Sequence, residues 1–204
     1  EEPIYRSWRE VYEEHGEDLP FDRWVQTVGT ADSFFQPQRN LEERLGRPLT
    51  EEVLTRRKDR RTALILSNQV LPGVVQRIDE ARTMGLKLGV ASSSTQEWVT
   101  GHLARLGILD RFDCVRCRDD VAHAKPEPDL FLAAAACLGV EPGESIAVED
   151  SPNGVAAAKR AGMKCVAIPN LITARLDLSQ ADLILDSLAD MTVGQLLERL
   201  SATA

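Results

Sequence analysis

The sequence predicts an α/β protein in which a core with a parallel sheet follows a small helical bundle. Residues 1–68 show helical periodicity only, with apolar residues recurring at three- and four-residue spacings. Residues 69–204 instead alternate short apolar segments with helical segments that end at glycine, and this alternation is typical of a parallel sheet. With 204 residues and 43% hydrophobic content, the chain can form one large domain and a smaller unit. We therefore expect a helical domain over 1–68 and an α/β core over 69–204.

Four helices are expected in the first domain. The first two carry apolar stripes, formed by Tyr5, Trp8, Val11 and Tyr12 and by Phe21, Trp24, Val25 and Val28. The third runs from Pro37 to Leu45 and ends at Gly46. The fourth starts at Thr50, a capping residue followed by two glutamates.

Five strands and five helices are expected in the core. The strands are predicted over 86–91, 112–117, 145–148, 164–168 and 183–185. The helices are predicted over 74–84, 94–106, 128–138, 152–161 and 193–200. The second of these helices is expected to start with a capping box of Ser94 and Glu97.

Composition excludes several classes of partner. The net charge is -8, and the basic run over 56–61 contains an acid and no aromatic residue, so nucleic-acid binding is not expected. No apolar run approaches the roughly 20 residues needed to span a bilayer, and the first residues resemble no signal peptide. We expect a cytoplasmic protein with no membrane partner, either a monomer or a weak homodimer.

The four cysteines lie in apolar or strand-like segments, as reduced core thiols do, and no disulfide is expected. Cys114 and Cys117 have the spacing of a zinc or redox pair. There is no second such pair, and zinc needs four ligands, so the alternation over 112–117 favours a strand.

Two polar features follow predicted strands or precede helices. Ser92 and Ser93 follow an apolar strand, so a hydroxyl and backbone N–H groups could bind a phosphate, although serines here are also common helix caps. Lys125 stands between Ala124 and Pro126 at a helix entrance. A cation held there could neutralise charge during phosphoryl transfer, or it could be an ordinary solvated lysine.

The third feature is a pair of adjacent carboxylates, Glu149 and Asp150, at the end of an apolar strand. Because like charges repel unless a cation neutralises them, and because magnesium prefers oxygen ligands, the pair predicts a Mg²⁺ site. The alternative is a pair of solvated acids in a loop. The carboxyl ends of parallel strands are also where such sheets place their functional sites.

Together, the order and spacing of these residues resemble the second, third and fourth motifs of the haloacid dehalogenase (HAD) superfamily. The segments 125–129 and 149–151 are specific for it, and the helical domain resembles the cap of the beta-phosphoglucomutase and phosphoglycolate phosphatase subgroup. The resemblance implies a Rossmann-like core in which Ser92 binds the phosphoryl group, Lys125 bridges it to the nucleophile, and Asp150, helped by Glu149, holds Mg²⁺. It also suggests Ser93, Asn153 and the cap residue Lys58 as substrate-binding residues, although Lys58 could equally be plain surface.

One motif of the family is missing. Members begin with a central strand ending in Asp-x-Asp, which carries the nucleophile and the general acid and base, and Asp-x-Asp occurs nowhere in the 204 residues. The resemblance places it upstream of Tyr5, between the strands that end at Ala91 and Val148. Unpaired buried backbone groups cost on the order of 1 to 3 kcal/mol each, so we expect the protein to carry this strand outside the sequence given.

The resemblance implies a magnesium-dependent phosphatase acting on a small phosphorylated metabolite. A beta-phosphoglucomutase-like mutase is an alternative, but the position of its cap-entry histidine is matched here by Ile4. Residues 28–32 match the cap loop that sets specificity. A second alternative is a non-catalytic module that binds phosphate or a partner.

Overall fold

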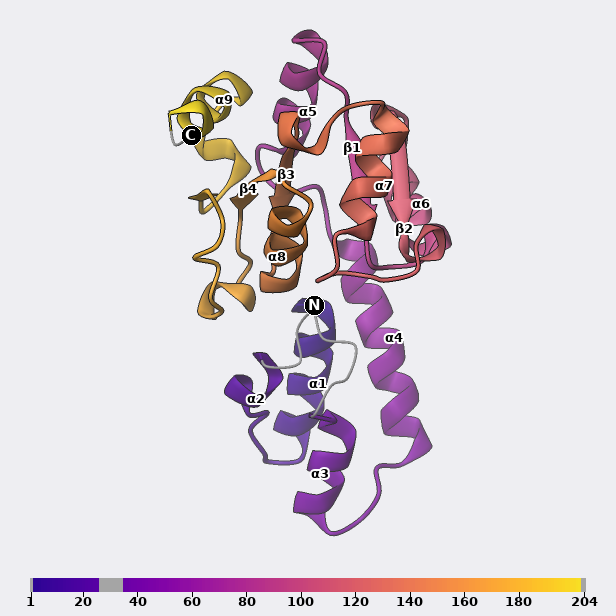
Figure 1. Ribbon diagram of the computed structural model, residues 1–204. Coiled ribbons are helices and arrows are strands. Elements are labelled where there is room, and N and C mark those ends of the chain that lie inside the picture. The colour runs from indigo at the N-terminus through magenta and orange to yellow at the C-terminus, as the bar shows by residue number, and fades with distance from the viewer. Residues whose placement is uncertain (1, 26–34, 203–204) are drawn as a thin grey trace. The chain divides into compact units, whose positions relative to one another are not determined.

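The computed structural model describes residues 2–25 and 35–202. The chain divides into two compact units (Figure 1). The helical unit comprises residues 1–69 together with 171–176, and the α/β unit comprises residues 70–170 and 177–204. The sequence did not predict that residues 171–176 belong to the helical unit. That the helical unit acts as a cap stays a prediction.

The helical unit is built from α1 (Glu2–Glu14), α2 (Phe21–Val25), α3 (Pro37–Leu45) and α4 (Glu51–Ser67). The apolar stripes form its core, which includes the buried side chains of Trp8, Tyr12 and Leu41 and, from the later segment, Ile172. The predicted helix ends are confirmed. Gly46 closes α3 with a left-handed φ of 64°, and the Thr50 hydroxyl accepts the Val53 N–H at the start of α4. Val28 and the predicted loop 28–32 lie outside the described residues.

The α/β unit alternates strands and helices as predicted (Figure 1). The strands are β1 (Gly89–Ser92), β2 (Cys114–Cys117), β3 (Ile146–Glu149), β4 (Lys164–Ala167) and β5 (Leu183–Ile184). The helices are α5 (Val74–Thr83), α6 (Gln96–Arg105), α7 (Asp129–Leu138), α8 (Pro152–Arg160) and α9 (Val193–Ser201). Short 3-10 helices span Leu109–Arg111, Arg118–Asp120, Pro142–Glu144, Thr173–Arg175 and Leu188–Asp190.

All strand pairs of the described residues are parallel, which confirms the fold class. They form two sheets, β1-β2 and β3-β4-β5, rather than one. Within the described residues, strands β1 and β3 therefore each have a partner on one side only. Val148 in β3 is 48% exposed. That a further strand lies between β1 and β3 stays a prediction.

The predicted starts of α6 and β1 are wrong. Helix α6 is capped by Thr95, whose hydroxyl accepts the Trp98 N–H at 3.4 Å, so the capping box of Ser94 and Glu97 does not form. The Ser94 carbonyl instead accepts the Arg118 N–H at 3.1 Å, which keeps Ser94 in the preceding loop. Strand β1 begins at Gly89 rather than at residue 86, and the Leu88 N–H donates to the Asp113 carboxylate at 2.8 Å.

The expectation of no disulfide is also wrong, because Cys114 and Cys137 are bonded to each other. Helix α7 packs on β2 and brings the two Cα atoms to 6.3 Å, within the range that a disulfide spans. A separation of 23 residues gives no sign of this in the sequence. Cys117 and Cys165 are free and buried, and burial raises the pKa of Cys165 to about 12. No helix within residues 2–25 and 35–202 is both long and apolar enough to cross a membrane.

Candidate active site

The loop after β1 is held in place by its neighbours in the α/β unit. The half-buried Ser92 hydroxyl accepts the Ser94 N–H at 3.2 Å, and Ser93 is exposed. The Asp119 carboxylate accepts the Gln96 N–H at 2.6 Å at the start of α6. Because Asp119 and the Thr95 cap already satisfy N–H groups of the first turn of α6, the predicted phosphate contact rests on Ser92 and Ser93.

Lys125 connects the carboxyl ends of β1 and β3. Its ammonium donates to the Ala91 carbonyl oxygen at 2.9 Å and to the Glu149 carboxylate, and it lies 4.5 Å from the centroid of the Phe131 ring. The Lys125 side chain is only 12% exposed. These contacts hold the Lys125 ammonium at the carboxyl ends of β1 and β3. Its role toward a phosphoryl group stays a prediction.

The adjacent acids Glu149 and Asp150 differ in burial and in hydrogen-bond partners. The Glu149 side chain is 8% exposed and packs against the backbone of Gly154 in the first turn of α8, where an added methyl group would collide with the carboxylate. Burial raises the pKa of Glu149, while the neighbouring Lys125 ammonium acts in the opposite direction. Asp150 is exposed, and its carboxylate accepts a hydrogen bond from Asn170 at 3.0 Å.

These two acids can be tested against the requirements of a magnesium site. Mg²⁺ is held in proteins by one or two carboxylates together with waters and substrate phosphate oxygens. Asp150 fits this role because its carboxylate reaches the surface. Glu149 is turned toward Lys125, and no cluster of three acidic, histidine or cysteine side chains suited to a metal occurs among the described residues. Asp150 therefore meets the requirements of a Mg²⁺ ligand, whereas the Glu149 carboxylate contacts Lys125.

The structure brings some of the predicted residues together and leaves others apart. Ser92, Lys125, Glu149 and Asp150 gather at the carboxyl ends of β1 and β3. Asn153 is half-buried in the first turn of α8, which Ser151 caps by accepting the Gly154 N–H at 3.2 Å. Lys58 is an exposed residue of α4 in the helical unit. The substrate-binding roles of Ser93, Asn153 and Lys58 stay predictions.

Three contacts at the site were not foreseen. They are the Phe131 ring beside Lys125, the Asn170 side chain on Asp150, and the Asp119 carboxylate at the start of α6. Phe131 follows Lys125 by six residues on an otherwise apolar helix, so the sequence alone gives it a core role. Asn170 lies in a connecting segment and Asp119 in a short 3-10 helix, and neither matches a motif that would mark it.

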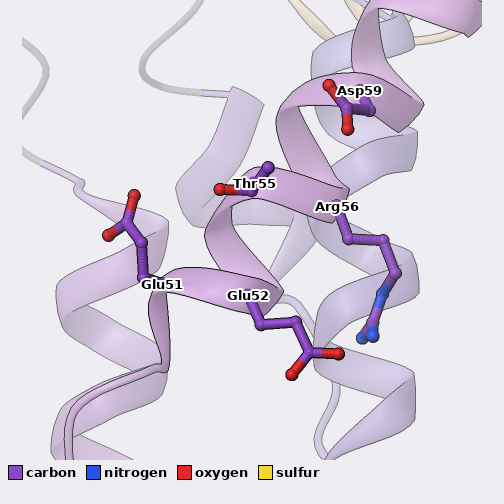
Figure 2. A pocket seen from close by; sticks show the side chains of 5 residues that line it. All are labelled: Glu51, Glu52, Thr55, Arg56 and Asp59. Carbon is purple, nitrogen blue, oxygen red and sulfur yellow. The ribbon is translucent and has the colours of Figure 1, made fainter.

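A shallow hollow on α4 of the helical unit contains none of the predicted site residues. Figure 2 shows its lining, which consists of Glu51, Glu52, Thr55, Arg56 and Asp59. The Arg56 guanidinium is paired with Glu14 of α1. The remaining acids, Glu51, Glu52 and Asp59, all stand on α4, and none of them is a predicted site residue.

The α/β unit thus carries a buried lysine, a serine and a carboxylate pair at the carboxyl ends of its strands. The family model of haloacid dehalogenase-like hydrolases matches residues 1–162, and the chain belongs to this family. This confirms the resemblance seen in the sequence and the expectation of a hydrolase.

Several known proteins resemble the chain over most of its length. YhcW of Bacillus subtilis (strain 168), which carries the name of a phosphatase, is 44% identical over 199 residues, covering 97% of this chain and 90% of YhcW. Hexitol phosphatase B of Escherichia coli (strain K12) is 33% identical over 153 residues, covering 74% and 68%. The crystal structure of a CbbY mutant from Rhodobacter sphaeroides with xylulose-(1,5)bisphosphate aligns with a TM-score of 0.69 at 26% identity, covering 96% and 92%.

Proposed function

We propose that the protein is a magnesium-dependent phosphatase that hydrolyses a small phosphate monoester, such as a sugar phosphate. The observation that carries this proposal is the placement of Lys125. Its ammonium is held between the end of β1 and Glu149, with the exposed carboxylate of Asp150 next in the chain. A cation and a metal-binding acid at one sheet end suit a reaction that depends on positioning and on neutralising phosphate charge.

Each residue has a distinct role in this proposal. The Ser92 hydroxyl donates to a phosphoryl oxygen, and the Lys125 ammonium neutralises charge on the phosphoryl group and on the nucleophile. Glu149 orients Lys125, because its carboxylate is buried against that ammonium. Asp150 is the Mg²⁺ ligand, held by Asn170. Bound Mg²⁺ would supply further neutralisation of the phosphate charge.

The nucleophile comes from outside the sequence given. The family resemblance implies an aspartate at the end of a central strand that forms an aspartyl-phosphate, and no Asp-x-Asp is present. The unpaired sides of β1 and β3 support this, since the implied strand belongs between them. The carboxyl end of that strand would then lie beside Lys125, which already joins β1 to β3.

The relatives support the substrate class. One is a hexitol phosphatase, and a structural neighbour was crystallised with a sugar bisphosphate. A phosphorylated sugar or polyol is therefore the first class to test. Hydrolysis is favoured over a mutase reaction because Ile4 has no group that could transfer a proton where the mutase has histidine. The binding-module alternative is favoured only by the missing nucleophile.

The test is release of inorganic phosphate from an aryl phosphate ester and from a panel of sugar phosphates. It compares the 204-residue chain with a version extended upstream to include the native preceding segment, each with Mg²⁺ and with a chelator. Activity in the extended version alone, abolished by the chelator, is expected. No release by either version would favour the binding module, and isomerisation of a sugar phosphate without release would favour the mutase.

A further inference from the structure

Four arginines of helix α4 fall into two pairs with different surroundings. Arg56 and Arg60 are paired with glutamates of α1. Arg60 makes two hydrogen bonds to Glu10, at 2.8 and 2.9 Å, and Arg56 is bonded to Glu14. These two guanidiniums are neutralised within the helical unit. They therefore require no further anion.

Arg57 and Arg61 stand one helical turn apart on another face of α4, and both are half-buried. The Arg57 guanidinium lies 4.4 Å from the centroid of the Trp8 ring. No carboxylate is paired with either arginine among the residues that the structure describes. The Nε atom of Arg61 is buried and makes no hydrogen bond. Two cations thus share one partly desolvated face, and no acid in residues 2–25 or 35–202 is paired with them.

This arrangement is unfavourable unless an anion joins it. Burial, and then the nearby charge of Arg61, lower the pKa of Arg57. An unsatisfied buried N–H also costs on the order of 1 to 3 kcal/mol. An oxyanion bound by the two guanidiniums would offset the repulsion between their charges.

We propose that Arg57 and Arg61, with Trp8 as the wall that fixes Arg57, form a binding site for a phosphate group in the helical unit. The planar fork of arginine matches phosphate oxygens in two parallel hydrogen bonds. A phosphate dianion carries enough charge and enough oxygens for two guanidiniums, whereas a carboxylate satisfies one fork. The ligand class is therefore a free phosphate ion or a phosphorylated small molecule.

The site can be tested with an arginine-specific reagent on the 204-residue chain. Phenylglyoxal labelling of each arginine is followed by peptide mass spectrometry, with and without inorganic phosphate, glycerol phosphate or acetate. Phosphate and its ester should slow labelling of Arg57 and Arg61 and leave Arg56 and Arg60 unchanged. Protection by the ion but not by the ester would assign free phosphate as the ligand. Equal protection of all four arginines, no protection of the first two, or equal protection by acetate would overturn the proposal.

Matched variants make the test sharper. Arg57→Lys keeps a cation over Trp8 but removes the fork, so it should weaken phosphate protection of Arg61 by about tenfold, the size expected for a lost hydrogen bond to a charged group. Arg60→Lys is the control and should leave that protection unchanged; equal effects of the two variants would contradict the site. Ser92→Ala should also leave the protection intact. A protein inactive as a phosphatase could still show protection, so this site and the proposed function fail independently.

Discussion

Replacing Lys125 with methionine should destabilise the protein and make its stability depend on pH. Lys125 is 12% exposed and Glu149 is 8% exposed, so the substitution leaves a carboxylate buried without its partner. It also removes the hydrogen bond to the Ala91 carbonyl and the contact with the Phe131 ring. Breaking a buried ion pair from one side costs about 3 to 5 kcal/mol. We expect a loss of that size in the free energy of unfolding near neutral pH.

The sign of the pH dependence follows from Glu149. Burial already raises its pKa above the ordinary 4.5, and loss of the Lys125 ammonium, which opposes that rise, should raise it further. A raised carboxyl pKa means that the folded state binds the proton more tightly than the unfolded state. The loss of stability caused by the buried, unpaired Glu149 carboxylate is thus fully present at pH values above the pKa of Glu149 in the folded variant. It should shrink as the pH falls through that value toward 4.5.

Urea unfolding followed by circular dichroism, at about pH 8 and at about pH 5, measures the free energy of unfolding of the Lys125→Met variant and of the unchanged protein. The control is the double variant Lys125→Met/Glu149→Gln, which removes the charge as well as the partner and should recover most of the loss at the higher pH. A loss in the single variant that is the same at both pH values would refute the reasoning. So would a double variant no more stable than the single one.

Three further predictions concern other parts of the structure. Gly154→Ala should destabilise the protein and lower activity, because the added methyl group would collide with the buried Glu149 carboxylate. The control is Gly101→Ala in the middle of α6, where nothing lies near the added methyl group, and it should stabilise the protein by about 0.5 to 1 kcal/mol. Thermal unfolding of the two variants measures both effects. Asp150→Asn, in the protein with its upstream segment, should raise the Mg²⁺ requirement and cut turnover at least about 100-fold, and wild-type kinetics would remove this residue from the metal site. Thiol titration of the unreduced, denatured chain should detect two free thiols, those of Cys117 and Cys165. Peptide mapping should find Cys114 joined to Cys137. Four free thiols would contradict the disulfide.

The local elements could be predicted because their signals are local. Glycine is favoured at the left-handed end of a helix, and Gly46 and Gly139 both close helices where the sequence placed them. The capping box at α6 failed because the loop before it is held by Arg118 and Asp119, which are distant in sequence. The expectation of no disulfide was wrong for the same reason, since Cys114 and Cys137 come together only when α7 packs on β2.

The candidate site was predictable at the level of motifs but not of contacts. Residue types and spacing predicted that Lys125 and the acidic pair belong to one site at the carboxyl ends of the strands. They could not show that Glu149 contacts the lysine while Asp150, just beyond the end of β3, is exposed, because only tertiary packing decides which of the two acids is buried. The Phe131 ring beside the ammonium depends on the same packing.

Phosphate release by the protein with its upstream segment tests the central proposal most directly. We expect Mg²⁺-dependent hydrolysis of a sugar phosphate or polyol phosphate, lost in Lys125→Met and strongly reduced in Asp150→Asn. We expect no release by the 204-residue chain alone. Magnesium-independent release, or full activity in the Lys125 variant, would contradict the proposal.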